Sequence, residues 1–312
     1  MNFLSMKYFL AVEKTRNITK AADHLHITQQ TLSAHIASIE KEVGCALFIR
    51  HTPLELTYAG TVFLSYAKQF ERLNRLMDKE FTDIRSEEKG VLHIGIAHTR
   101  GRVIMPDLID RYQKAYPKMQ IIITEATNDI LRRKLTDGEL DLIIATFPED
   151  DPEIESRSLY EEEVVLLVSR SLLDRLYGDR AASLVEAVQQ RHDLSPLFEC
   201  PFLLVSPEDI AGKIANQLIT EASFVPRVGT QSSNIETLLE LCLKGAGACF
   251  CPEVLTKRAV PRQALAALQI IRFGDLAKYQ IKLGWLKQRY TWRGIVNFLD
   301  IAANVKCENW RS

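Results

Sequence analysis

Residues 17–44 read NITKAADHLHITQQTLSAHIASIEKEVG, and this stretch decides the fold of the amino-terminal part of the chain. Its second half repeats apolar residues at spacings of four, three and four, which predicts a helix with one apolar stripe. Thr28 is suited to begin that helix as an N-cap, and Gly44 is suited to end it as a left-handed C-cap. The predicted stripe consists of Leu32, Ile36, Ile39 and Val43.

A second helix is predicted just before this one, with Thr19 as its N-cap, and a two-residue connection joins the two. Two helices with so tight a turn are typical of a helix-turn-helix, whose second helix enters the DNA major groove. From periodicity alone, a three-helix cap that uses the stripe only for packing stays open as an alternative.

The face opposite the stripe is polar and uncharged at its amino-terminal end, in the block TQQTLSAH at residues 28–35. A helix face that is only solvated more often carries Lys, Glu and Arg. Glutamine offers adenine a bidentate donor–acceptor pair, and a small residue such as Ala34 lets the backbone approach the groove. The hairpin that follows carries Arg50 and His51 and can act as a wing against phosphate or the minor groove.

A long amphipathic pattern runs from Tyr58 to Arg85. A helix of this length and apolar character needs a partner, and an antiparallel copy from a second chain is the economical choice. Packing against the carboxy-terminal part of the same chain is the alternative. The apolar positions are Val62, Tyr66, Phe70, Leu73, Met77, Phe81 and Ile84, and SEEKG at residues 86–90 is the predicted linker.

After Gly90 the pattern alternates between strands and helices, which predicts a right-handed, mostly parallel sheet. The order of elements predicts two α/β lobes joined by crossing strands, the layout of periplasmic binding proteins. Open α/β sheets bind ligands beyond the carboxyl ends of their strands, and a helix that starts there offers its amides to an anion. The candidate effector residues at those ends are His98, Thr99, Arg100, Thr127, Asn128, Thr146, Ser206, Gln231, Ser232 and Ser233. For each of them, ordinary helix capping is the alternative.

The composition is that of a globular chain long enough for two domains, with 312 residues, 46% hydrophobic and 25% charged residues, and a net charge of −1. No apolar run reaches the length of a transmembrane helix, and no basic segment precedes the first apolar one, so we expect a cytoplasmic protein without a membrane partner. The cysteines form no Cys-x-x-Cys pair, and we predict neither a metal site nor another cofactor. Cys200, in a segment flanked by prolines, is the one candidate for a reactive thiol.

The skeleton AA..L.ITQ..LS..I..IE...G..LF.R and the closing LT.AG resemble the winged helix-turn-helix of LysR-type transcriptional regulators. LDLIIAT after L.DGE, and LLELCLKGAGACFCPE, look like the effector domain of that family. The chain departs from the family at Ala34, where a basic residue is frequent, at Pro53, where glycine is common, and in the longer segment 172–202, which reads as added helix. The resemblance implies base contacts from Gln29, Gln30 and Ser33, contacts nearer the phosphates from Thr28, Thr31, His35 and Arg50, and effector contacts around Thr99, Arg100, Thr127 and Ser206.

We therefore predict an α+β multidomain chain: a winged helix-turn-helix domain at 1–60, a linker and dimerisation helix with hinge at 61–89, and a two-lobed α/β effector domain, similar to periplasmic binding proteins, at 90–312. Lobe I covers about 90–160 and 275–312, and lobe II covers about 161–274. The predicted function is transcription regulation by a homodimer or homotetramer that binds two-fold half-sites in double-stranded DNA. A small-molecule effector, an anion such as a carboxylate, modulates that binding.

Two alternatives stay open. A regulator of the same architecture can respond to oxidants through Cys200. An enzyme is the second alternative, but the sequence contains no nucleophile elbow, glycine-rich phosphate loop or metal-ligand spacing, so we predict that the chain is not an enzyme.

Overall fold

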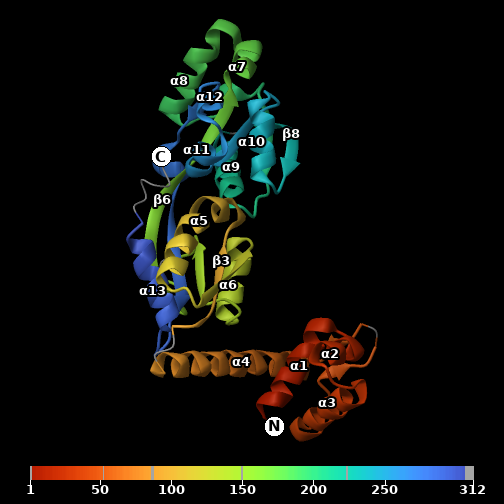
Figure 1. Cartoon of the computed structure of the whole chain (residues 1–312). Coiled ribbons are helices and arrows are strands. Elements are labelled where there is room, and N and C mark those ends of the chain that lie inside the picture. The colour runs from red at the N-terminus through yellow and green to blue at the C-terminus, as the bar shows by residue number, and fades with distance from the viewer. Residues whose placement is uncertain (1, 52, 86–87, 149, 223, 306–312) are drawn as a thin grey trace. The chain divides into compact units, whose positions relative to one another are not determined.

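A computed structural model describes residues 2–51, 53–85, 88–148, 150–222 and 224–305. The chain divides into two compact units. The first contains residues 1–90 with 136–139 and 290–293, and the second contains 91–135, 140–289 and 294–312. Figure 1 labels the elements of both units.

The first unit begins with three helices, a two-stranded hairpin and a long helix. Asn17, and not Thr19, caps the second helix, because its extended backbone lets the side chain accept a hydrogen bond from the Lys20 amide at 2.9 Å. The predicted caps of the third helix are confirmed: Thr28 accepts from the Thr31 amide at 3.1 Å, and Gly44 has φ 78°. The elements are α1 (Phe3–Thr15), α2 (Ile18–Leu25), α3 (Gln29–Val43), β1 (Phe48–Ile49), β2 (Glu55–Leu56) and α4 (Tyr58–Ile84).

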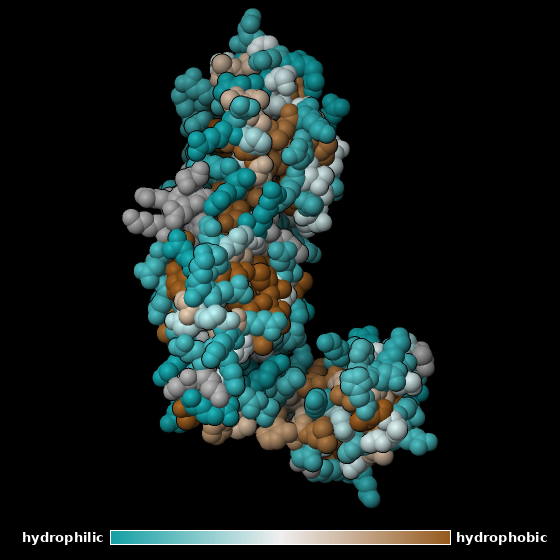
Figure 2. All heavy atoms as spheres, viewed as in Figure 1, coloured by the Kyte–Doolittle hydropathy of each residue, from teal (hydrophilic) through white to brown (hydrophobic). Residues whose placement is uncertain are grey.

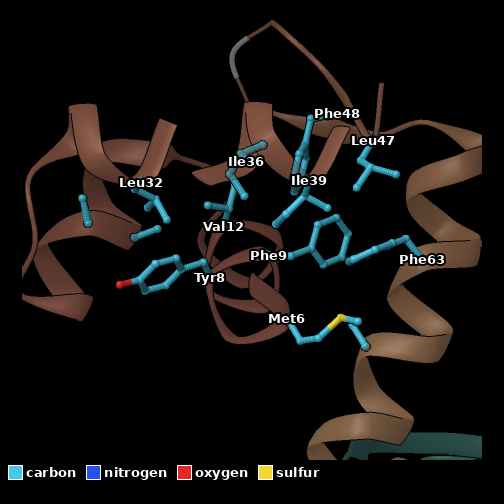
Figure 3. Close-up of a cluster of buried hydrophobic side chains, with 13 residues drawn as sticks. Met6, Tyr8, Phe9, Val12, Leu32, Ile36, Ile39, Leu47, Phe48 and Phe63 are labelled. Carbon is cyan, nitrogen blue, oxygen red and sulfur yellow. The ribbon is translucent and has the colours of Figure 1, made fainter. Parts of the chain in front are cut away.

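The core of the first unit forms around Phe9, whose ring lies 4.6 Å from that of Phe63 on α4 and 5.0 Å from that of Phe48 (Figure 3). Leu32, Ile36 and Ile39 of the predicted stripe are buried in it. Val43 is 38% exposed, so its assignment to the stripe is wrong. The stripe ends one turn early because α3 leaves the core before its C-cap.

Gly60 explains the close fit of α4 on the hairpin. A Cβ atom at this position would lie 2.1 Å from the Leu47 carbonyl oxygen, so only glycine permits the approach. Thr57 caps α4 by accepting from the Gly60 amide at 2.9 Å, and its own hydroxyl donates to the Ala46 carbonyl at 2.7 Å.

The second unit is built on one mixed sheet with the strand order β4-β3-β5-β11-β6-β9-β7-β8, and β10 pairs with β6. Its first elements are β3 (Gly90–Ile96), α5 (His98–Ala115), β4 (Met119–Glu125), α6 (Asn128–Thr136), β5 (Leu142–Ala145) and β6 (Ile154–Ser169). They continue with α7 (Arg170–Tyr177), η1 (Gly178–Arg180), α8 (Ala181–Arg191), η2 (Ser195–Leu197), β7 (Pro201–Val205), α9 (Ile210–Glu221), β8 (Arg227–Ser232), α10 (Ile235–Leu243) and β9 (Ala248–Pro252). The last are α11 (Glu253–Ala259), α12 (Arg262–Leu265), β10 (Leu268–Ile271), η3 (Gly274–Ala277), β11 (Lys278–Leu286) and α13 (Arg293–Ala303).

The sheet is parallel at β3–β5, β7–β8 and β7–β9, but antiparallel where β11 meets β5 and β6 and where β6 meets β9 and β10. The prediction of a mostly parallel sheet is therefore right for the two ends and wrong for the centre. The reason is β6, whose residues 154–163 pair with β11, whereas residues 164–169 pair with β9 and β10. Strands β6 and β11 cross between the lobes, as predicted (Figure 1).

Lobe II contains one helix that the sequence did not predict, α9, which connects the parallel strands β7 and β8. Strand β8 begins at Arg227, directly after Pro226, which cannot donate to a ladder. The added helix predicted for residues 172–202 is confirmed by α7 and α8.

Candidate DNA-binding and effector-binding sites

The first turn of α3 presents its polar side chains to the outside of the unit. Thr28, Gln29, Gln30 and Thr31 are exposed, and Ser33 is half-buried. The Gln29 side-chain amide donates to the Ser33 hydroxyl at 3.1 Å. Gln30 makes no side-chain hydrogen bond within the described part of the chain, so its amide is available for a base edge.

His35 and the hairpin are held by contacts inside the unit. The His35 ring stands edge-on to Tyr8, with 4.8 Å between ring centroids. His51 Nδ1 lies 2.6 Å from the Pro53 carbonyl oxygen, and its Nε2 lies 3.6 Å from Glu55.

Glu40 organises the wing, and the sequence reasoning missed it. Its Oε1 accepts from the Leu47 and Phe48 amides at 2.8 and 3.2 Å, and its Oε2 accepts from Arg50 Nη2 at 3.1 Å. The Arg50 side chain is 72% exposed, so the ion pair orients the guanidinium without removing it from the surface. The available signal was an acidic residue on the shoulder of the apolar stripe, just ahead of the hairpin.

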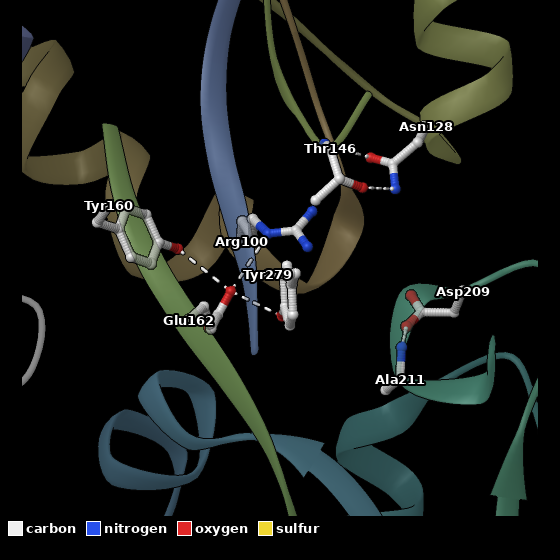
Figure 4. Close-up of polar contacts among 8 residues, drawn as sticks. All are labelled: Arg100, Asn128, Thr146, Tyr160, Glu162, Asp209, Ala211 and Tyr279. Carbon is white, nitrogen blue, oxygen red and sulfur yellow. Dashed lines mark hydrogen bonds and ion pairs between the residues drawn. The ribbon is translucent and has the colours of Figure 1, made fainter. Parts of the chain in front are cut away.

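In the second unit, Arg100 forms the centre of a buried polar cluster on lobe I and the crossing strands (Figure 4). Arg100 Nε donates to Glu162 Oε2 at 3.4 Å, and both side chains are 2% exposed. The hydroxyls of Tyr279 and Tyr160 donate to the same oxygen at 2.8 and 3.4 Å. The Arg100 guanidinium carbon lies 5.5 Å from the centroid of the Tyr279 ring.

The outer nitrogens of Arg100 have no partner. Within the described residues, Nη1 and Nη2 of Arg100 and the Thr99 hydroxyl are shielded from solvent and make no hydrogen bond. Helix α5 begins at Ala97 without a side-chain cap and has no acidic residue in its first turn. Unpaired buried donors and an uncapped helix start together leave a place for an acceptor or an anion.

The electrostatics of the cluster follow from its burial. Burial raises the pKa of the Glu162 carboxyl, although the Arg100 charge and the Tyr279 hydroxyl act in the opposite direction. Burial also lowers the pKa of Arg100, but Tyr279 and Glu162 outweigh that effect, so the net direction is upward and the guanidinium stays cationic.

The remaining predicted effector residues are mostly engaged in local contacts. Asn128 Nδ2 donates to the Thr146 hydroxyl at 2.8 Å, and the Thr146 amide donates back to Asn128 Oδ1 at 3.3 Å (Figure 4). The Thr127 carbonyl accepts from the Leu131 amide at the start of α6. His98 begins α5, but its side chain lies outside the described residues.

Across the sheet edge, the two serine hydroxyls make local hydrogen bonds. The Ser206 hydroxyl accepts from the Glu208 amide at 3.4 Å, and the Ser232 hydroxyl accepts from the Asn234 amide at 3.1 Å. Gln231 is exposed near the end of β8. Asp209 caps α9 and accepts from the Ala211 amide at 2.8 Å. At the helix start that follows Ser232 and Ser233, the Asn234 side chain caps α10 by accepting from the Glu236 and Thr237 amides at 3.0 and 3.3 Å.

Sequence reasoning also missed Glu162, Tyr160 and Tyr279. The only signal for Glu162 was strand alternation, which places it on the same face as Val164 in the run EEEVV. No local signal connected the two tyrosines with Arg100.

Cys200, the one candidate for a reactive thiol, lies in the interior of the second unit. Cys200 is fully buried, and burial raises the pKa of its thiol to about 12. Cys242, Cys249 and Cys251 are also fully buried, whereas Cys45 is exposed. A buried thiol with a raised pKa is a weak nucleophile, which counts against Cys200 as an oxidant sensor. Cys307 lies outside the described residues.

The described part of the chain brings together no group of three or more His, Cys, Asp or Glu side chains that could hold a metal ion. None of its helices combines the length and the apolar character that a membrane crossing requires.

Comparison with known families assigns both units. A family model described as a bacterial regulatory helix-turn-helix protein of the lysR family matches residues 3–61, and one described as a LysR substrate binding domain matches residues 85–306. The chain therefore belongs to the LysR family. It is a DNA-binding transcriptional regulator with an effector-binding domain and not an enzyme.

Individual relatives agree with this assignment. An uncharacterized HTH-type transcriptional regulator, YcgK of Bacillus subtilis, is 27% identical over 279 residues, which cover 86% of this chain and 85% of the relative. The hydrogen peroxide-inducible genes activator of Haemophilus influenzae is 30% identical over 171 residues, 54% of this chain and 56% of that protein.

Solved structures share the fold over nearly the whole chain. CbnR, a LysR family transcriptional regulator, complexed with its target DNA, covers 97% of this chain and 99% of its own at 22% identity, with a TM-score of 0.63. A full-length OxyR from Pseudomonas aeruginosa covers 98% of this chain and 96% of its own at 22% identity, with a TM-score of 0.69.

Proposed function

We propose that this regulator acts in the cytoplasm as a homodimer or a tetramer and that its effector is a small anion, such as a carboxylate, bound by Arg100. The observation that carries the effector proposal is the pair of buried, unpartnered Nη atoms on Arg100. A planar guanidinium with two free N–H groups on one edge matches a carboxylate bidentately.

Neighbouring groups support the same class of ligand. The Thr99 hydroxyl and the uncapped start of α5 supply further donors beside Arg100. Thr127, Asn128 and Thr146 belong to the proposed site as polar walls at the ends of β4 and β5. Because the Nη atoms are shielded from solvent, the effector reaches them when the lobes joined by β6 and β11 move apart.

The proposed dimer forms through α4. The apolar residues of its repeat are exposed in the isolated chain, and Figure 2 shows apolar side chains at the surface along this helix. Exposed apolar surface on one helix face is stabilised by a matching face, and a second α4 supplies one. Two recognition helices then read two half-sites related by a two-fold axis. Ile122 and Ile123 on the edge strand β4 are also exposed and provide a surface for pairing dimers into tetramers.

On the DNA face, Gln30 is the proposed base reader, with Gln29 and Ser33 beside it. Thr28, Thr31, Arg50 and His51 are proposed to contact the backbone. His35 packs against Tyr8 and is proposed to act nearer the phosphates.

The effector proposal is tested by a thermal-shift screen of organic acids and matched neutral amides on the full-length protein. Ligands that bind only the native state raise the melting temperature. We expect acids to do so, and the shift to disappear in Arg100→Gln but not in Arg102→Gln, whose side chain is 60% exposed on the same helix. Shifts produced only by the neutral amides, or retained in Arg100→Gln, would rule out the anion site.

The same acids are then tested in footprinting on the promoter region of the regulator's own gene. We expect two protected half-sites whose extent of protection changes with the acid, and protection that weakens steeply with salt. If no acid that raises the melting temperature changes the protection, the acids bind the protein without regulating its DNA binding.

A further inference from the structure

The buried cluster holds an ion pair that is already neutral before any effector binds. Arg100 and Glu162 are each 2% exposed, and their side chains meet at 3.4 Å between Nε and Oε2. Two tyrosine hydroxyls add hydrogen bonds to the same carboxylate oxygen. Glu162 therefore neutralises one side of the guanidinium, whereas the Nη atoms on the other side are unpaired.

A monovalent anion bound to those Nη atoms would place two negative charges and one positive charge in a buried site. Burying an excess charge is costly, and a nearby group that can take up a proton removes that cost. Resting on the anionic effector proposed above, we propose that Glu162 takes up one proton from solvent when the anion binds Arg100. The site then accepts one anion and one proton together, and the proton forms an O–H bond on the Glu162 carboxyl.

Glu162 is the group in the cluster that is suited to this role. Its pKa is already raised by burial, so a second negative charge raises it further. The pKa of the Tyr279 hydroxyl is also raised by burial, and that of the Cys251 thiol is raised to about 12, so both stay protonated near neutral pH. The groups that face Glu162 are Arg100 from α5, Tyr160 from β6, Tyr279 from β11 and Cys251 from β9.

The test is calorimetric titration of the full-length protein with sulfate and with trifluoroacetate. Both probes keep their charge between about pH 5.5 and about pH 8.5, so any change in affinity over this range reports a protein group. Each titration is run in two buffers with different ionisation enthalpies, which gives the number of protons taken up. We expect uptake approaching one proton, and affinity that falls about tenfold for each pH unit above the midpoint.

Glu162→Gln keeps the size and an acceptor oxygen but cannot change its charge. We expect this variant to bind both probes with the same affinity at every pH, and more tightly than the wild type at about pH 8.5, because Arg100 has lost its internal counter-charge. A role of Glu162 in folding alone would not produce this gain. If Glu162→Gln does not fold, the proton count of the wild type still decides the question. His98→Gln and Asp209→Asn are the controls, and both should keep the pH dependence.

The outcomes separate this inference from the proposed function. Binding that depends on Arg100 but takes up no proton overturns the inference and leaves the anionic effector in place. Loss of the pH dependence in His98→Gln or Asp209→Asn also overturns it, because the proton then resides elsewhere. If neither probe binds, or if Arg100→Gln binds both as the wild type does, the anion site and the inference fail together.

Discussion

At the scale of single residues, hydrogen bonding separates the two glutamines at the start of α3. The Gln29 amide donates to the Ser33 hydroxyl at 3.1 Å, so base contact by Gln29 requires that bond to break. Gln30 is exposed on the same turn, without such a bond in the described part of the chain. Ala34 leaves the neighbouring position free of charge, so the readout depends on uncharged donors and acceptors.

Gln30→Ala is therefore expected to reduce discrimination at one base pair by about 1–3 kcal/mol and to leave nonspecific binding nearly unchanged. Selection from a randomised half-site measures the first quantity, and binding to an unrelated duplex measures the second. Lys41→Ala, at an exposed position further along α3, is the control that should retain base preference. Unchanged preference in Gln30→Ala would remove this residue from base readout.

Cys200 shows how burial decides reactivity. Sequence context made it the one candidate for a reactive thiol, but Cys200 is fully buried between η2 and β7 in the chain, and burial raises its pKa to about 12. Because the thiolate is the reactive form, native Cys200 should react with peroxide far more slowly than the exposed Cys45.

We expect peroxide treatment to leave DNA binding unchanged in a Cys307→Ser background, with mass spectrometry showing oxidation at Cys45 and none at Cys200. Brief exposure to denaturant should make both thiols reactive. Rapid oxidation of native Cys200, accompanied by a change in DNA affinity, would restore the oxidant-sensing alternative.

At the scale of elements, one carboxylate joins the recognition helix to the wing. Glu40 accepts hydrogen bonds from the backbone amides at the start of β1 and forms an ion pair with Arg50 at 3.1 Å. Its side chain is 12% exposed, so the two amides have little access to water as a substitute partner.

Glu40→Ala should destabilise the first unit by about 1–3 kcal/mol, because it leaves the Leu47 and Phe48 amides unsatisfied. It should also weaken DNA binding, because Arg50 loses the contact that orients it. Chemical unfolding and binding titrations measure the two effects. Glu42→Ala, on an exposed position of the same helix, should change both much less.

At the scale of the whole molecule, the apolar repeat of α4 that begins at Val62 and ends at Ile84 is exposed and does not contribute to the core of the first unit. Phe70 and Leu73 are 41% and 55% exposed, whereas Phe63 and Ala67 of the same helix are buried in the core. The helix thus has one set of apolar residues for folding and another that is proposed to pack against a second chain.

Phe70→Glu combined with Leu73→Glu should therefore convert the dimer into a monomer without unfolding it, because opposed α4 faces would bring like charges together. Sedimentation at micromolar concentration gives the oligomeric state, and affinity for a paired operator should fall by at least about tenfold. The control is Gln69→Glu, an exposed position outside the apolar repeat. A double variant that stays dimeric would exclude α4 as the dimer interface.

Local sequence alone determined most helices and strands, including the extent of α3 and α4 and the caps at Thr28 and Gly44. This was possible because periodicity and capping depend on neighbours within a few residues along the chain. Where the local signal was shared by several positions, as for the cap at Asn17 or the end of the stripe at Val43, the choice depended on packing and the prediction was wrong.

Only the tertiary structure decided what surrounds Arg100. Glu162 is 62 residues away from Arg100 in the chain, and Tyr279 is a further 117 residues away. The antiparallel crossing of β6 and β11 brings them together beside the start of α5. Register between distant strands is set by burial of the whole sheet, so no local pattern could show that Arg100 has a buried counter-charge on one side and free donors on the other.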